Sequence, residues 1–315
     1  MTERHGAIVS ILLCVLFWGF SFVSIKEAVA VFPPMTLGAV RFALALILLA
    51  LIKRRLVPAE KPAPGDLPWL LGSGFTGVTL YFFCENNGVA LVSASEASII
   101  VGSIPVLAVA AEWARDCVFR RRTGAAAGRS GIWRWMGALL SAAGVILAAG
   151  FSLTGAGGKM GLSFSGNIPG CLYMTGAAVS WTAYCFLTEP LFARHSRIFI
   201  VFWQNLFGFL GFLPFTVPEY PRWGRPDLPV LLHTAFLGIC CSALAYYLYA
   251  RSLDILGAGV SGVFINLVPV VTVTAGFFLL GDRLNPLQWA GAALVISGVY
   301  LVMLERPRRP GRAKP

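Results

Sequence analysis

The strongest chemical signal in the sequence is one acidic side chain inside a long apolar run. Glu85 lies in the run from Leu67 to Val92. An ionisable group within a membrane span is costly and is by default a functional candidate. Desolvation disfavours the charged carboxylate, so Glu85 could exchange a proton as a binding site opens to each side of a membrane in turn. Tyr81, on the same helix face, and Asn86 could hydrogen-bond it. Alternatively, Glu85 lies near the outer interface or pairs with another helix.

A basic side chain gives the second signal. Arg41 lies six residues inside the apolar run that begins at Met35. Its guanidinium could bind a carboxylate group of a ligand or counter the charge of Glu85. Alternatively, the long side chain snorkels to the outer headgroups. A further acidic residue, Glu112, lies three residues before Arg115 at the end of a later run, where we expect a solvated pair.

Other reactive chemistry is not indicated. The three His residues are scattered, and the seven Cys residues lack the spacing of a zinc site. The sequence contains no G-x-x-x-x-G-K-[ST] phosphate loop, no H-E-x-x-H or G-x-S-x-G motif, and no acidic metal pair. We therefore expect no cofactor, no metal, no catalytic residue and no enzymatic activity.

Apolar runs must position these residues. The chain is 57% hydrophobic and 12% charged, and the charged share is about half that of a soluble protein. A run of about 20 apolar residues crosses a bilayer. Each such run must be helical, because lipid satisfies no backbone hydrogen bonds. The ten runs are Ile8–Ile25, Met35–Ile52, Leu67–Val92, Ala97–Ala111, Trp133–Phe151, Ile168–Leu187, Ile198–Val217, Pro229–Ala250, Leu256–Gly281 and Leu287–Leu304.

The positive charges predict the orientation. Nineteen Lys and Arg residues fall in the segments on the side of the N-terminus, against five on the other side. Because cytoplasmic loops carry the excess of Lys and Arg, we expect both termini in the cytoplasm and the chain in the plasma (inner) membrane. The net charge of +11 lies between and after the apolar runs, so we expect no nucleic-acid partner.

The chain also repeats itself. Pairs of matching residues recur 163 or 164 positions apart: Trp18 and Trp181, Arg41 and Gln204, Ala94 and Ala258, Pro105 and Pro269. Later pairs are 154 apart: Trp135 and Trp289, Gly137 and Gly291, Gly144 and Gly298. With five runs per repeat, the second copy enters the membrane from the opposite side, as in secondary transporters.

We therefore predict an all-α polytopic membrane protein of ten transmembrane helices, arranged as two inverted five-helix repeats. The repeats span residues 1–155 and 156–305, and a basic cytoplasmic tail covers 306–315. Pro105 and Pro269 are expected to kink their helices. The small-residue pairs Gly137/Ser141 and Ala293/Ser297 are expected to allow close helix packing.

Two motifs resemble a known family. One is Leu16-Phe17-Trp18-Gly19-Phe20-Ser21 followed by Arg41-Phe42, and the other is Leu279 to Leu284 followed by Gln288-Trp289-Ala290-Gly291 and Gly298. In this order they resemble the EamA-type repeats of the drug/metabolite transporter superfamily. The resemblance extends from about Ile8 to Leu304, although Gly281-Asp282 stands where the family usually has Gly-Glu, and the first repeat lacks that signature.

The resemblance implies a ten-helix carrier of small metabolites with a cavity between its helices. It adds candidate substrate-binding residues from the cavity-lining spans, which could contact a metabolite or simply pack: Trp18, Ser21, Trp181, Tyr184, Tyr246 and Asn266. Asn266 could instead hydrogen-bond a carbonyl group released by Pro269. Together with Arg41, Tyr81, Glu85 and Asn86, these residues form the predicted site.

The repeat and the resemblance predict a secondary active transporter that works by alternating access. Its partners would be the lipid bilayer, a small solute such as an amino acid, and protons as the candidate coupling ion. The resemblance favours export, by a monomer or homodimer. The alternatives are a membrane-embedded enzyme acting on a lipid-linked substrate, and a scaffold or receptor subunit. Solute flux into liposomes containing only this protein would support the transporter alone.

Overall fold

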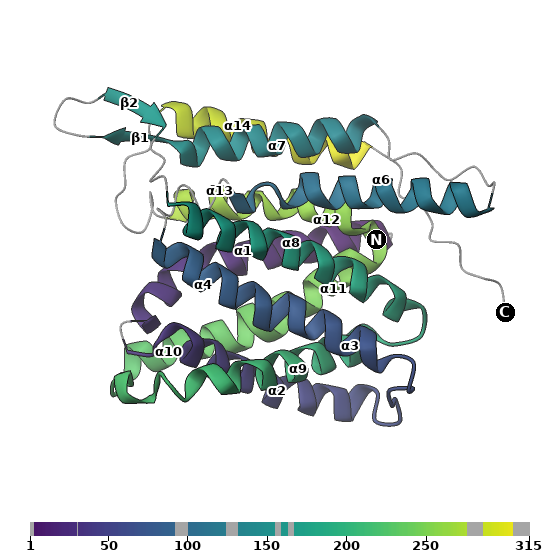
Figure 1. Cartoon of the computed structure of the whole chain (residues 1–315), viewed down its shortest axis with the longest axis vertical. Helices are drawn as coiled ribbons and strands as arrows, with labels where there is room; N and C mark the ends of the chain where they lie inside the picture. Colours follow the sequence, from purple (N-terminus) through teal and green to yellow (C-terminus); the bar gives the residue numbers. More distant parts are fainter. Residues whose placement is uncertain are drawn as a thin grey trace. The chain divides into compact units, whose positions relative to one another are not determined.

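The structure is a computed structural model that describes residues 3–29, 31–91, 100–123, 132–154, 159–162, 167–275 and 286–304. Helices make up nearly all of the described chain (Figure 1). The predicted basic tail at 306–315 and the motif from Leu279 to Leu284 lie outside the described residues.

Each of the ten predicted spans overlaps a helix or consecutive helical segments. They are α1 (Glu3–Val29), α2 (Pro34–Leu56), α3–η1–α4 (Leu67–Gly74, Phe75–Leu80, Tyr81–Leu91), α6 (Ile104–Thr123), α7 (Ile132–Gly150), α8 (Ile168–Thr188), α9 (Arg197–Thr216), α10–η4–α11 (Leu228–Phe236, Leu237–Leu244, Ala245–Leu256), α12–α13 (Ala258–Ile265, Leu267–Ala275) and α14 (Pro286–Leu304). Segments η1 and η4 are π-helical, and the short 3-10 segments η2 (Glu189–Ala193) and η3 (Tyr220–Arg222) lie in connections. The predicted all-α fold is confirmed.

Length and hydropathy identify five membrane-crossing candidates within the described residues. These are Glu3–Ser21, Pro34–Leu56, Leu67–Gly88, Arg197–Thr216 and Leu228–Leu256. Three shorter apolar helices, Ile132–Leu147, Ala258–Val271 and Trp289–Leu304, come from three further predicted spans.

Two connections differ from the prediction. The predicted spans Ala97–Ala111 and Trp133–Phe151 leave a connection between them, but α6 continues to Thr123, because no Gly or Pro interrupts this part of the chain before Gly124. After α7, strand β1 (Phe151–Thr154) pairs antiparallel with β2 (Lys159–Leu162). The sequence analysis predicts no strand between these spans, since four residues are the shortest run in which an alternating strand pattern can be recognised.

The helices break close to the two prolines, as predicted. A turn at Gly102 and Ser103 precedes α6, in which Pro105 is the second residue. In the second repeat, α12 ends at Ile265 and α13 begins at Leu267, two residues before Pro269. Proline lacks the N–H group of an α-helical hydrogen bond and its ring crowds the preceding turn, so the helix is weakest there.

The chain divides into two compact units. Unit 1 comprises Met1–Asn87 and Ala183–Asp254, and unit 2 comprises Gly88–Thr182 and Ile255–Pro315. Each unit therefore contains helices from both predicted repeats. Within each unit, helices of one repeat pack against helices of the other, so the two repeats do not form separate compact bodies.

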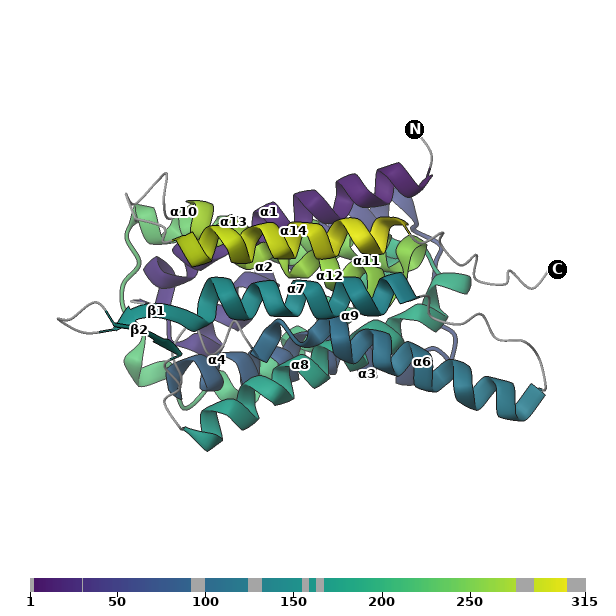
Figure 2. The same cartoon turned by 90° about the horizontal axis from the view of Figure 1, so that it is seen from above.

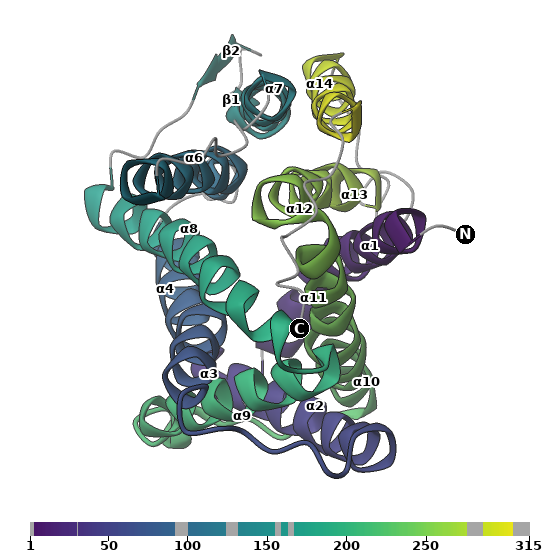
Figure 3. The same ribbon diagram turned by 90° about the vertical axis from the view of Figure 1, so that its right-hand side faces the viewer.

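Within unit 1, α2 and α9 lie side by side (Figure 3), and each also packs against a π-containing span. A Cβ atom on Gly74 would lie 2.7 Å from the carbonyl oxygen of Gln204 in α9. A Cβ atom on Gly238 would lie 3.0 Å from the carbonyl oxygen of Arg41 in α2. The two glycines are 164 positions apart and their partners 163 apart. Each repeat thus makes the same close contact with the other.

Within unit 2, α7 and α14 lie side by side along their length (Figure 2) and make reciprocal contacts. A Cβ atom on Gly137 would lie 2.6 Å from the carbonyl oxygen of Gly298, and one on Gly298 would lie 2.6 Å from that of Gly137. A Cβ atom on Gly144 would lie 2.7 Å from the carbonyl oxygen of Gly291. Reciprocal pairing of this kind is the signature of a two-fold arrangement of like segments.

Only one of the two predicted small-residue pairs lies in this contact. Gly137 and Ser141 are both buried and face α14. Ala293 and Ser297 are exposed, so the prediction for them is wrong. The face of α14 that packs against α7 contains Gly291 and Gly298 instead. These two residues are seven positions apart, so a search for small residues four positions apart does not find them.

Two glutamates cap the paired helices α2 and α9 from opposite ends. Glu60, in the connection after α2, accepts hydrogen bonds from the backbone N–H and the hydroxyl of Ser196, the N-cap of α9. Glu219, in the connection after α9, accepts from the backbone N–H groups of Met35 (3.2 Å) and Thr36 (2.7 Å) in α2. A carboxylate at a helix N-terminus satisfies otherwise unpaired N–H groups and complements the helix dipole. Each helix is therefore capped by the segment that follows its partner.

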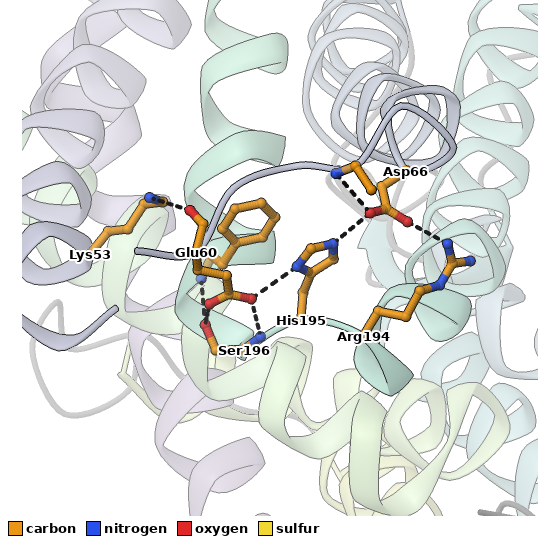
Figure 4. A network of polar contacts seen from close by, with 8 residues as sticks. Lys53, Glu60, Asp66, Arg194, His195 and Ser196 are labelled. Atoms are coloured by element: carbon orange, nitrogen blue, oxygen red, sulfur yellow. Dashed lines mark hydrogen bonds and ion pairs between the residues drawn. The ribbon is translucent and has the colours of Figure 1, made fainter. Parts of the chain in front are cut away.

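A network of charged side chains surrounds the first of these caps (Figure 4). His195 contacts two carboxylates: Nδ1 lies 2.9 Å from Glu60 Oε1 and Nε2 lies 2.8 Å from Asp66 Oδ2. Ionised carboxylates only accept hydrogen bonds, so both contacts are satisfied when both ring nitrogens carry protons. Arg194 pairs with the other oxygen of Asp66, and Lys53 Nζ donates to the Glu60 carbonyl oxygen at 3.2 Å. The network ties the α2–α3 connection to the segment between α8 and α9.

Asp66, just outside the span, is the buried centre of this network. The hydrogen bond from His195 lowers the pKa of the Asp66 carboxyl group, and the backbone N–H of Ala63 and the charge of Arg194 act in the same direction. Burial opposes them by disfavouring the charged form. A carboxyl group with a lowered folded-state pKa contributes stability above its unfolded pKa of about 3.9 and loses it as pH falls through the folded value.

We predict that replacing Gly144 by Ala lowers the melting temperature of the purified protein in detergent. The added Cβ would lie 2.7 Å from the backbone atoms Gly291 O and Val295 N, which cannot rotate away. Overpacking of this kind costs about 1–3 kcal/mol. Gly65→Ala is the matched control, because a Cβ atom there meets nothing within 4 Å. Equal melting temperatures for the two variants would contradict the close α7–α14 contact.

We also predict a pH-dependent effect of Asp66→Asn. The variant should melt below the wild-type protein at pH 5 to 8. The difference should shrink as pH falls below about 4, where the unfolded wild-type chain begins to take up a proton at Asp66, and further as pH falls through the lower pKa of the folded state. Asp227→Asn is the control at neutral pH, because Asn can replace Asp as the N-cap of α10. A melting difference for Asp66→Asn that stays constant down to pH 2 would show that the carboxylate charge does not stabilise the network.

Candidate functional site

The structure places the ten predicted site residues in both units. Eight lie in unit 1: Trp18, Ser21, Arg41, Tyr81, Glu85, Asn86, Tyr184 and Tyr246. Trp181 and Asn266 lie in unit 2. The candidate site is therefore described from unit 1, and the other two residues by their own surroundings.

Four aromatic side chains form a cluster in unit 1, here called the aromatic cluster: Trp18, Tyr184, Tyr246 and Tyr249. The Trp18 ring lies 5.9 Å from Tyr246 and 5.6 Å from Tyr249, measured between ring centroids. Tyr184 lies 6.2 Å from Tyr246 and stacks with Tyr249 at 6.3 Å. The three tyrosines are fully buried or nearly so. Aromatic faces at these distances pack stably and can also stack on an organic solute.

The two π-helical segments fix the polar tips of this cluster. Trp18 Nε1 donates to the carbonyl oxygen of Cys241 in η4 at 3.1 Å. Tyr246 donates its hydroxyl to the carbonyl oxygen of Gly77 in η1 at 2.9 Å. The two acceptors are 164 positions apart, so each repeat offers the same carbonyl. A π-helical turn displaces its carbonyl groups from the regular pattern, and such turns recur at functional sites.

Arg41 is buried in unit 1, where it is 5% exposed. Its Nε donates to Ser242 Oγ at 2.7 Å, and its guanidinium carbon lies 5.0 Å from the Phe82 ring centroid and 5.5 Å from that of Phe42. The terminal nitrogens have no hydrogen-bond partner among the described residues, and they are not fully enclosed. Snorkelling to the headgroups, one alternative from the sequence, is thus not what the structure shows. The terminal nitrogens are available to an anionic group.

Glu85 and Tyr81 form the pair that their spacing predicts. The Tyr81 hydroxyl donates to Glu85 Oε1 at 2.9 Å. Asn86 does not join them, because its amide contacts the carbonyl oxygen of Pro34 at 3.4 Å. The described residues include no ion pair between Glu85 and Arg41, although Tyr81 packs edge-on against Phe82, the ring beneath the guanidinium. Tyr81 thus connects Glu85 to the Phe82 ring over which the Arg41 guanidinium lies.

The remaining predicted residues are described within their own units. The Ser21 hydroxyl donates to the carbonyl oxygen of Trp18 within α1 at 2.7 Å. Trp181 is buried in unit 2. Asn266 donates to Gly102 O at 3.3 Å and to Ser141 Oγ at 3.0 Å. The alternative from the sequence, a bond from Asn266 to a carbonyl group released by Pro269, is therefore not what the structure shows. The partner carbonyl lies in the turn before the other proline, because Gly102 and Asn266 occupy matching positions of the two repeats.

Glu112 also departs from the prediction. It is 3% exposed, not solvated, and it pairs with Arg134 at 2.8 Å. Its second oxygen accepts from the backbone N–H of Gly259 at 2.8 Å, in the first turn of α12. A carboxylate at this position caps α12 and joins it to α7. The sequence could not reveal this, since the partners lie 22 and 147 positions away.

Sequence reasoning missed three residues of unit 1 that shape the site. Tyr249 lies three residues after Tyr246 on the same helix face, so helical spacing could have identified it. Ser242 and Phe82 carry no such signal. Their position against Arg41 depends on which helices pack together and on the π-helical register of η4.

The chemistry available here is recognition and proton exchange. The described residues contain no group of three or more His, Cys, Asp or Glu side chains that could hold a metal ion. They bring together aromatic faces, a guanidinium with free terminal donors, and a carboxyl group hydrogen-bonded to a phenol. These groups can bind a carboxylate, an amine and an apolar body.

Comparisons with known proteins agree with this description. The model of the EamA-like transporter family matches residues 5–116 and 168–304. An uncharacterized transporter of Archaeoglobus fulgidus is 26% identical over 296 residues, covering 93% of this chain and 97% of its own length. A probable terminal-alkyne amino-acid exporter of Streptantibioticus cattleyicolor is 26% identical over 296 residues, covering 94% of this chain and 93% of its own.

A solved crystal structure has the same fold. It superposes with a TM-score of 0.75 at 21% sequence identity, and the match covers 96% of this chain and 99% of that one.

Proposed function

We propose that this chain, which belongs to the EamA-like transporter family, is a secondary active exporter of small zwitterionic metabolites such as amino acids. We further propose that it works by alternating access and that protons drive it through Glu85. Family membership makes the chain a multi-pass membrane transporter with a small-molecule substrate. The solute class, the direction and the coupling ion are the proposal.

One observation carries the proposed solute class. In unit 1, Arg41 lies over the Phe82 ring, and Glu85 is hydrogen-bonded to Tyr81, whose ring packs against Phe82. No ion pair joins these two described charged residues. A guanidinium with two free terminal nitrogens favours a carboxylate, since both can donate in parallel. A nearby carboxyl group favours an ammonium group. An amino acid carries both charges a few ångströms apart.

The relatives support the same class and direction. The Streptantibioticus cattleyicolor protein is described as a probable amino-acid exporter, and it aligns over nearly the whole of both chains. An amino-acid cargo and export are therefore consistent with a protein of the same architecture. The aromatic cluster would accommodate an apolar side chain of the solute.

Glu85 supports the proposed coupling. A half-buried carboxyl group with a single phenol donor can exist with or without its proton, because the phenol hydroxyl can donate to the carboxylate or accept from the acid. If the acid binds a proton on one side of the membrane and releases it on the other, solute movement follows the proton gradient. The Tyr81 hydroxyl would hold the side chain in place in both states.

The experiment is counterflow into proteoliposomes with a panel of radiolabelled amino acids at pH 5 to 8. We expect wild-type protein to move at least one of them, faster when a proton gradient is imposed. Glu85→Gln should still bind and exchange solute but lose the pH dependence, whereas Glu85→Asp should keep part of it. Glu27→Gln is the matched control, because this carboxyl group on α1 is exposed.

Two results would contradict the proposal separately. Failure of every amino acid to exchange would exclude the solute class. Normal pH-dependent flux by Glu85→Gln would leave the solute class intact and exclude Glu85 as the coupling group.

We also propose that both termini face the cytoplasm, on the basis of the charge bias. A reporter fused after Pro315 should then be active in the cytoplasm, and one inserted at Gly157 should be active outside. Both positions lie outside the described residues. A cytoplasmic reporter at Gly157 would contradict the inverted arrangement of the two repeats.

A further inference from the structure

Segment η4 approaches α2 more closely than ordinary side chains allow. Gly238, in its first turn, faces the α2 backbone, where a Cβ atom would lie 2.7 Å from Leu44 Cβ. Four residues later, Ser242 is fully buried and its hydroxyl accepts a hydrogen bond from Arg41 Nε at 2.7 Å. The close approach therefore places one hydroxyl group against one edge of the guanidinium.

This contact leaves a particular part of the guanidinium free. Arginine has five N–H donors in a planar fork, one on Nε and two on each terminal nitrogen. Ser242 accepts from Nε, so the end of the fork formed by the two terminal nitrogens remains available. A carboxylate can accept two parallel hydrogen bonds from that end. The rings of Phe42 and Phe82 lie near the guanidinium, at 5.5 and 5.0 Å from its carbon atom, and restrict how it can move.

The corresponding contact in unit 1, between η1 and α9, has similar packing but does not position an arginine. Gln204, which matches Arg41 in the repeat, donates to the hydroxyls of Ser73 (2.9 Å) and Thr188 (2.8 Å). In η1, the buried Thr79 hydroxyl donates to the backbone carbonyl oxygen of Gly208 in α9 at 3.0 Å. Both π-helical segments thus hydrogen-bond the helix on which they pack. Only η4 does so through a charged side chain.

We propose that Ser242 is a positioning residue that orients Arg41 to bind the carboxylate group of the transported solute. Ser242 does not itself contact the solute. Removing its hydroxyl frees the guanidinium to rotate about its side chain, so the terminal nitrogens no longer meet the carboxylate in a fixed orientation. The inference rests on the proposed function only in taking Arg41 as the group that meets the solute. It is independent of the direction of transport and of proton coupling.

The test measures KM and maximal rate in proteoliposomes for an amino acid that the wild-type protein exchanges, and competition by its amide, which lacks the carboxylate. Ser242→Ala should raise KM about tenfold, as loss of a hydrogen bond to a charged group predicts, with a smaller change in maximal rate. As KM rises, the preference for the amino acid over its amide should fall. Ser242→Cys, which keeps the approximate side-chain volume but is a weaker acceptor, should have a KM between those of the wild-type protein and Ser242→Ala.

Thr79→Ala is the matched control, because it removes a buried hydroxyl that joins a π-helical segment to its partner helix without touching Arg41. It should lower the melting temperature about as much as Ser242→Ala but leave KM and the amide preference unchanged. In an Arg41→Lys background, Ser242→Ala should have no further effect on KM, because the group it positions is gone. Independent, additive effects of the two changes would overturn the inference.

The failure of this inference differs from failure of the proposed function. If the wild-type protein exchanges amino acids and Arg41→Lys raises KM while Ser242→Ala and Ser242→Cys do not, Ser242 is structural and only the inference is wrong. If Arg41→Lys leaves KM unchanged, or no amino acid is exchanged, the proposed role of the site is wrong and the inference falls with it.

Discussion

Helices in a membrane gain little from hydrophobic burial against one another, because lipid tails are as apolar as the side chains they would replace. Association then depends on how closely the backbones approach. In unit 2 the glycines of α7 and α14 permit this approach, and in unit 1 Gly74 and Gly238 do so. These contacts decide which helices are neighbours, and the neighbours decide which polar groups can meet. The arrangement of the candidate site therefore depends on which helices pack together.

Close packing also explains what the π-helical segments η1 and η4 contribute to the candidate site. A π-helical turn moves carbonyl groups out of the regular helical pattern, and η1 and η4 offer such groups to Tyr246 and Trp18. In water these carbonyls would be solvated. In an apolar surrounding each needs a donor, so an aromatic side chain with a polar tip is bound in a fixed position. The same turn in η4 places Ser242 against Arg41. Local irregularity thus orders the side chains of the site.

Electrostatics has a different role at the helix ends. Glu60, which follows α2, caps α9, and Glu219, which follows α9, caps α2. The two helices are therefore joined at both ends. One cap belongs to a network that contains His195 and Asp66 (Figure 4), while the other is completed by Thr36 and Trp223, whose indole donates to the Thr36 hydroxyl. The two caps therefore have different chemical surroundings. Arg41 and Gln204 show the same divergence within the spans.

The sequence by itself determined the helical fold, the approximate positions of the ten spans and their repetition, because apolar length and residue spacing are local properties that lipid constrains strictly. It also identified Arg41 and Glu85, since charge inside an apolar run is visible without any structure, and it paired Tyr81 with Glu85 through helical spacing. It could not identify Ser242 as the partner of Arg41, Glu112 as the cap of α12, or Gly102 as the partner of Asn266. Those contacts join residues up to 201 positions apart. Only the tertiary structure decided them, because a hydrogen bond depends on the distance between two atoms, and close helix packing sets that distance.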